Sequence, residues 1–130
     1  LLAKVPSSHY VFVDFHAETT GEKISMAWYL DGRVSAIVGT HTHVQTADYR
    51  VLPKGTGYLT DVGMVGAYDG VLGMEKDAAI RRYLTQMPVR FEVTKGRTQL
   101  NAVLLDFSSE TKQTKKMKLI RIDDDNPLFF

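Results

Sequence analysis

The residues best suited to chemistry in this chain are three histidines that follow apolar, strand-like segments. His41 and His43 stand one residue apart after the β-branched run 36–38, and His16 follows a second apolar run, residues 10–15. Alternate residues of an extended segment share a face, and neutral imidazole is a common ligand of Zn, Fe, Mn and Ni. The spacing therefore makes all three histidines candidate metal ligands.

A histidine pair of this spacing has a second interpretation, in which one imidazole is a hydrogen-bonded structural residue. The position of His16 favours the metal site, because the carboxyl ends of strands carry the functional sites of α/β proteins. Asp14 and Asp61 also lie in or at the ends of expected strands, where they could bind metal or support an imidazole. For both we favour the alternative of a strand-end carboxylate that accepts hydrogen bonds from backbone amides.

The elements that must position these side chains alternate between strand and helix. A helix over 22–30, capped by Thr19 or Thr20, has Trp28 on its apolar stripe, and a clearer helix over 75–87 ends at Pro88. The glycine-dense stretch 62–74 has the size of a functional loop but lacks a phosphate-binding spacing. The order predicts an α/β fold ending in an antiparallel β meander, with strands at 10–15, 34–39, 57–61, 89–94, 99–107 and 115–122, and a short strand at 49–52.

Composition narrows the classes of function. The chain has 130 residues, 44% of them hydrophobic, which predicts one folded domain or half-domain over residues 1–130. A net charge of +1 gives no electrostatic case for a nucleic-acid or membrane partner, and the absence of cysteine excludes thiolate metal sites. No apolar run or leader predicts membrane insertion or export, so we expect a cytoplasmic protein. The chain opens on Leu1 in what resembles a helix end, and we expect it to begin inside a larger protein.

Six motifs together resemble one protein family. They are DFHAE at 14–18, VGTHTHVQT at 38–46, LPKGT at 52–56, TDVGM at 60–64, YDGVLGM at 68–74 and MPVRF at 87–91. In these motifs the chain resembles the YmdB-like branch of the calcineurin-like metallophosphoesterases, bacterial proteins associated with 2′,3′-cyclic nucleotide phosphodiesterase activity. The resemblance covers nearly the whole chain, but only the C-terminal half of the family's proteins. It implies the C-terminal half of a four-layer α-β-β-α sandwich.

The resemblance also implies a site with two metal ions that share a bridging carboxylate and a bridging hydroxide. His16 and His41 would then bind one ion and His43 the other. The ions would be Mn or Fe, with Zn or Mg as alternatives, and the substrate a small phosphodiester or cyclic nucleotide. The bridging carboxylate, an asparagine ligand and the histidine that protonates the leaving group would come from an N-terminal half absent here. The implied partners are that half or further copies of the chain.

Two alternatives remain at this stage. The chain alone could be a non-catalytic subunit, because three histidines without the bridging carboxylate should hold metal poorly. It could also be a hydrolase with one metal ion on three histidines, unrelated to this family. A metal content near one ion per chain with full activity would favour the second alternative.

Overall fold

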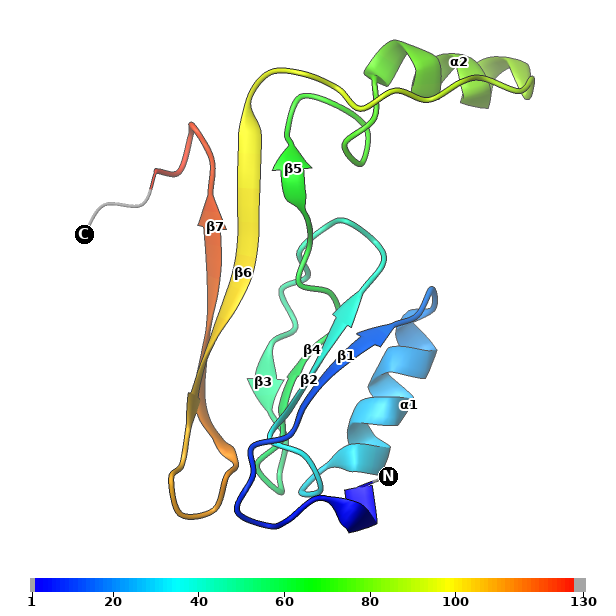
Figure 1. The fold of residues 1–130 in the computed structure, drawn as a ribbon. Coiled ribbons are helices and arrows are strands. Elements are labelled where there is room, and N and C mark those ends of the chain that lie inside the picture. Colours follow the sequence, from blue (N-terminus) through cyan, green and yellow to red (C-terminus); the bar gives the residue numbers. More distant parts are fainter. Residues whose placement is uncertain (1, 128–130) are drawn as a thin grey trace. The chain divides into compact units, whose positions relative to one another are not determined.

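The computed structural model describes residues 2–127 (Figure 1). Their contacts divide the chain into two compact units. The first unit comprises residues up to Gly63 together with Ala102–Ile120, and the second comprises Met64–Asn101 together with the segment from Arg121 onward. The mixed α/β class predicted from the sequence is confirmed, with two sheets and two α-helices among the described residues.

The first unit is built on a four-stranded sheet in the order β1-β2-β4-β3. The strands β1 (Phe12–His16), β2 (Ala36–Thr40) and β4 (Gly57–Leu59) run parallel, and the short β3 (Arg50–Val51) pairs antiparallel with β4. In the β1–β2 register, His16 lies beside Thr40, the last residue of β2. The sheet therefore places the two segments that carry the three candidate histidines at the same edge.

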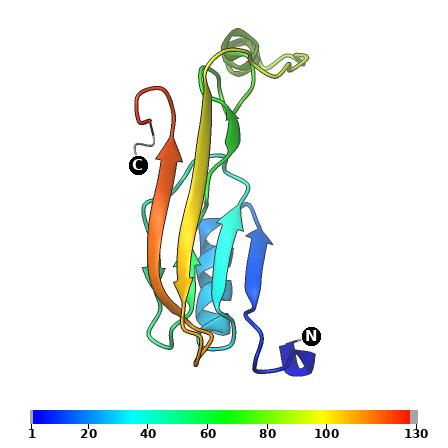
Figure 2. The ribbon, with the colours of Figure 1, turned by 60° about the vertical axis from the view of Figure 1, so that its left-hand side comes forward.

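Helix α1 (Thr20–Leu30) joins β1 to β2 and lies along one face of this sheet (Figure 2). Of the two predicted cap residues, Thr19 caps the helix, and it forms a capping box with Glu22. The core beneath α1 contains Ala27, Leu30, Val34, Ile37, Leu52 and Tyr58. The prediction that Trp28 belongs to this core is wrong. Its side chain is 50% exposed because Ala27 and Leu30 form the face that meets the sheet, and the Arg50 guanidinium lies 5.8 Å from its ring.

The opposite face of the sheet is covered by first-unit residues of two long strands, β6 (Thr98–Phe107) and β7 (Thr114–Ile122). The side chains of Val38, Leu59 and Met117 form the buried cluster there, with Val103, Leu105 and Leu119 packed around them. Strand β2 is thus buried on both faces, Ile37 on one and Val38 on the other. This explains its continuous apolar sequence.

The second unit contains β5 (Val65–Ala67) and helix α2 (Lys76–Thr85). Strand β5 pairs antiparallel with the start of β6, so the second sheet has the order β5-β6-β7. The predicted strand over 89–94 is wrong. Pro88 lacks an N–H, and apart from the isolated bridge between Val93 and Met74 this segment pairs with no strand among the described residues. The third strand of the second sheet is instead β5, which lies inside the glycine-dense stretch 62–74 that we predict to be a loop.

Within residues 2–127, no helix has both the length and the apolar character needed to cross a membrane.

Candidate functional site

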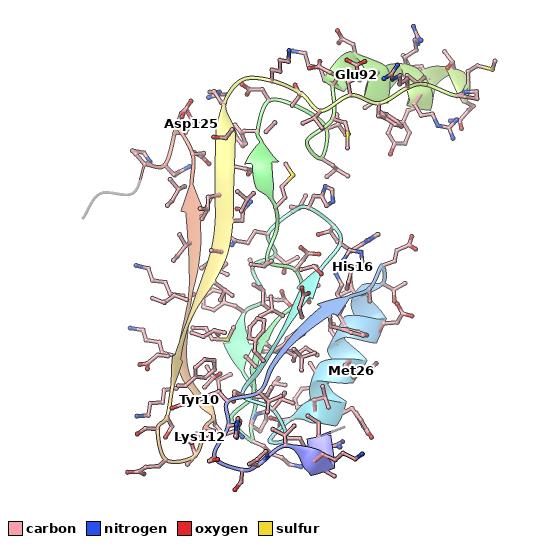
Figure 3. All side chains as sticks on the ribbon, in the orientation of Figure 1. Tyr10, His16, Met26, Glu92, Lys112 and Asp125 are labelled. Carbon is pink, nitrogen blue, oxygen red and sulfur yellow. The ribbon has the colours of Figure 1, made fainter. Side chains whose placement is uncertain are left out.

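His16 and His41 meet at the carboxyl edge of the β1–β2 pair. The Nε2 atom of His16 lies 3.2 Å from Nδ1 of His41, and the two rings stand edge to face at 82° with centroids 5.0 Å apart. Both side chains are exposed, and Figure 3 shows His16 at the end of β1. The pairing follows from the parallel register, because His16 sits beside Thr40 and His41 is the next residue along.

The separation of these two nitrogens suits two ligands of one metal ion. Nitrogen ligands bound at about 2.0–2.1 Å to a tetrahedral ion lie roughly 3.3 Å apart, close to the observed spacing. Two neutral imidazoles are a donor set that Zn, Mn and Fe accept. The arrangement therefore fits half of a metal coordination shell.

The hydrogen bond at Nδ1 of His16 determines which of its two ring nitrogens carries a lone pair that can bind a metal ion. Its Nδ1 lies 3.1 Å from the Thr40 hydroxyl, which donates its only hydrogen to Oδ1 of Asp14 at 2.9 Å. In the neutral ring the hydroxyl then accepts the hydrogen of Nδ1, so Nε2 carries the lone pair and accepts a hydrogen bond from Nδ1–H of His41. Metal-binding histidines are commonly oriented by such a partner on their other nitrogen. Asp14 thus supports His16 through Thr40, and this is the interpretation of Asp14 that we had not favoured.

His41 and His43 do not lie on an extended strand, as the argument from alternation supposed. Strand β2 ends at Thr40, and the backbone φ angles of His41 and His43 are 126° and 64°. Positive φ is uncommon for residues with a β-carbon, and such backbone strain concentrates at functional sites. A turn rather than strand alternation therefore brings His41 against His16.

The described residues do not complete a metal site by themselves. Among residues 2–127, no group of three or more His, Asp or Glu side chains is arranged to hold a metal ion. His43 lies in the same turn as His41, but it does not form such a group with His16 and His41. The assignment of metal ions to the three histidines stays a prediction.

Asp61 anchors the turn that carries His41 and His43. Its Oδ2 accepts the backbone N–H of Thr42 at 2.8 Å, and its Oδ1 accepts that of Gly63 at 2.9 Å. The favoured interpretation of this residue, a strand-end carboxylate bonded to amides, is confirmed. Burial acts to raise the pKa of Asp61, but these hydrogen bonds and that from Lys23 together hold it below its usual value.

Lys23 is the important residue that the sequence reasoning missed. Its Nζ lies 3.0 Å from Oδ2 of Asp61, and both side chains are only 1% exposed. The signal was available, because residues 23, 27 and 30 share one helix face and the other two are the apolar Ala27 and Leu30. A lysine on a core-facing stripe requires a buried partner of opposite charge.

The glycine-dense stretch 62–74 lies mainly in the second unit. It contains β5 and a tight turn closed by a bridge between Val71 and Met74. A β-carbon at Gly70 would approach the Met74 carbonyl oxygen to 2.4 Å, so the turn requires glycine there. A functional role for this stretch stays a prediction.

Comparison with known proteins places the chain in one protein family. A match to the family of YmdB-like proteins extends over residues 1–120, and the chain belongs to that family. It is 57% identical over 120 residues to a protein of Bacillus subtilis named 2′,3′-cyclic-nucleotide 2′-phosphodiesterase. That alignment covers 92% of this chain but 46% of the relative.

Two solved structures resemble the chain closely. A hypothetical protein from Thermus thermophilus superimposes with a TM-score of 0.87 at 42% identity, over 94% of this chain and 47% of the other. A protein of Mycoplasma pneumoniae described as a novel phosphatase gives a TM-score of 0.83 at 46% identity, over 88% of this chain and 41% of the other. The chain thus spans less than half the length of each of these relatives.

Proposed function

We propose that this chain supplies one part of the active site of a metal-dependent phosphodiesterase that hydrolyses small phosphodiesters such as 2′,3′-cyclic nucleotides. The observation that carries the proposal is the 3.2 Å approach of His16 Nε2 to His41 Nδ1, with the lone pair of His16 directed at that contact. The name of the Bacillus subtilis relative supports the reaction and the substrate class. The remaining layers of a four-layer sandwich would come from outside this chain.

The residues of the chain have distinct tasks in this proposal. His16 and His41 would hold one ion, and His43 would serve a second. Mn and Fe are the ions we propose, with Zn or Mg as alternatives; when bound, such ions acidify a water molecule and stabilise negative charge on the phosphate. Thr40 and Asp14 keep His16 in the tautomer that binds metal. Asp61 holds the backbone between His41 and His43.

A second candidate function follows from the incomplete ligand set. The chain alone would be inactive and would need the portion that its relatives carry in addition. Two observations favour this reading: the described residues lack a group of three ligands, and β1, the outer strand of its sheet, leaves Phe12, Asp14 and His16 exposed. A strand face that carries both an apolar side chain and candidate ligands suits a surface completed by further protein.

The test uses this chain combined with the portion of the Bacillus subtilis relative that it does not match. His16→Ala and His41→Ala should each lower Mn-dependent hydrolysis of bis(p-nitrophenyl) phosphate by at least about a hundredfold, because each removes a ligand. His9→Ala is the matched control, since His9 is exposed, lies before β1 and contacts the neighbouring Ser8. If His16→Ala and His41→Ala both kept the activity of the His9→Ala control, the proposed site would be refuted.

A further inference from the structure

The first unit buries an ion pair next to the turn that carries His41 and His43, residues 41–46, which we call the histidine turn. Lys23 reaches from α1 to Asp61, just past the end of β4, and both side chains are 1% exposed. The lysine passes over β2 at Gly39, where an added β-carbon would come within 2.9 Å of Lys23 Cδ and 1.8 Å of the Thr60 carbonyl oxygen. Gly39 therefore opens the path by which the ammonium group reaches the carboxylate.

Asp61 contacts the histidine turn at both of its ends. Through its side chain it accepts the N–H of Thr42, the residue between His41 and His43. Through its backbone it accepts the N–H of Thr46 and donates to the Thr46 hydroxyl, each at 3.0 Å. The histidine turn, residues 41–46, is thus fixed to the residue that Lys23 neutralises.

The turn needs such an anchor because its backbone is strained. The φ of 126° at His41 is one that residues with a β-carbon rarely adopt, so the surroundings must impose it. Hydrogen bonds to a charged acceptor are stronger than those to a neutral one. A buried ion pair is costly to desolvate and adds little net stability to a fold. The stability of the first unit is therefore a weak reason for a charged side chain at position 61, and its hydrogen bonds to the histidine turn are a better one.

We propose that Lys23 and Asp61 form a positioning pair that holds the histidine turn in the conformation that presents His41 to His16. The pair touches neither substrate nor metal; it acts through the Thr42 amide. That the imidazoles bind metal rests on the proposed function, but the position of the His41 ring does not depend on it. The two ideas can therefore fail separately.

The test compares Asp61→Asn and Lys23→Met with Asp31→Asn, in this chain combined with the complementary portion of the relative. Asp31 is a matched control because its buried carboxylate also accepts backbone N–H groups, those of Lys54 and Thr56, but not in the histidine turn. Asp61→Asn and Lys23→Met should weaken Mn binding at least tenfold in a metal titration. Asp31→Asn should lower the unfolding midpoint comparably and change Mn affinity less than twofold.

A second readout uses no metal. In the metal-free chain, the nuclear Overhauser contact between the His16 and His41 rings should disappear in Asp61→Asn and persist in Asp31→Asn. Loss of ring contact and of Mn affinity specific to the Lys23 and Asp61 variants supports the positioning role. An unchanged ring contact in Asp61→Asn overturns it, as does an effect equal to that of Asp31→Asn. If the wild type binds no Mn but the ring contact responds as expected, the proposed function fails and the positioning pair stands.

Discussion

At the scale of single residues, the two facing histidines are held by different means. His16 belongs to a regular strand and is oriented by a relay from Asp14 through the Thr40 hydroxyl. His41 lies just beyond a strand, in a turn with strained backbone. The residue types alone identified all three histidines as candidate ligands, since imidazoles after apolar runs are recognisable in any sequence. Their partners were harder to predict, because Thr40 and Lys23 acquire a role only once the parallel register is known.

The relay predicts that the Thr40 hydroxyl supports metal binding. Thr40→Val keeps the shape of the side chain but removes the group that accepts from His16 and donates to Asp14. Mn affinity should fall about tenfold, the lower end of the effect of removing a partner that orients a ligand. Thr40→Ser retains the hydroxyl and should stay near wild type in the same titration. Equal Mn affinities for Thr40→Val and Thr40→Ser would show that the hydroxyl does not orient His16 for metal binding.

The lowered pKa of Asp48 leads us to expect that the free energy of unfolding depends on pH. Partial burial acts to raise its pKa, but hydrogen bonds from the Thr60 and Thr46 hydroxyls and the Thr60 N–H hold it below its usual value. A carboxylate with a lowered pKa stabilises the fold above its unfolded pKa of about 3.9, and the contribution is lost as the pH falls through the folded pKa. Asp48→Asn should therefore lower the unfolding free energy at pH 7, and the difference from wild type should shrink as the pH is brought toward 3. A difference that stays constant with pH in urea unfolding would contradict this assignment.

At the scale of elements, local signals predicted the first unit well. The helix cap at Thr19 and the continuous apolar run of β2 are short-range features that depend on neighbouring residues. The two errors have a long-range cause. Whether residues 65–67 or residues 89–94 form the third strand of the second sheet depends on which segment reaches β6, and that pairing joins residues more than 30 positions apart in the sequence.

Gly39 provides the test at this scale. Gly39→Ala would place a β-carbon 1.8 Å from the Thr60 carbonyl oxygen, so β2 and the residues after β4 would have to move apart. The free energy of unfolding should fall by roughly 1–3 kcal/mol or more, as in other overpacked sites. Gly21→Ala is the control, because nothing lies within 4 Å of its β-carbon and alanine favours helix by about 1 kcal/mol. Urea unfolding should therefore show a lower free energy of unfolding for Gly39→Ala and a higher one for Gly21→Ala. An increase for both variants would show that Gly39 is not required for packing.

At the scale of the whole molecule, the proposed function requires that further protein cover the exposed face of β1. Phe12 is 54% exposed on β1, on the same strand face as Asp14 and His16. Phe12→Ser should leave the chain folded but weaken its association with the complementary portion of the relative by at least about tenfold, because it removes an apolar contact. Tyr83→Ser, equally drastic on the exposed surface of α2 in the second unit, is the control. If isothermal titration found equal affinities of Phe12→Ser and Tyr83→Ser for the complementary portion, Phe12 would not contribute to that interface.

The central claim is that this chain supplies two facing imidazoles to a metal site that other residues complete. The most direct measurement is bound metal per chain by elemental analysis after exposure to Mn, for the chain alone and for the chain combined with the complementary portion of the relative. We expect little metal in the first sample and about two ions in the second, of which at least the ion held by His16 and His41 is lost on His16→Ala. Stoichiometric metal with phosphodiester hydrolysis by the chain alone, or metal uptake by the combined sample that His16→Ala leaves unchanged, would contradict it.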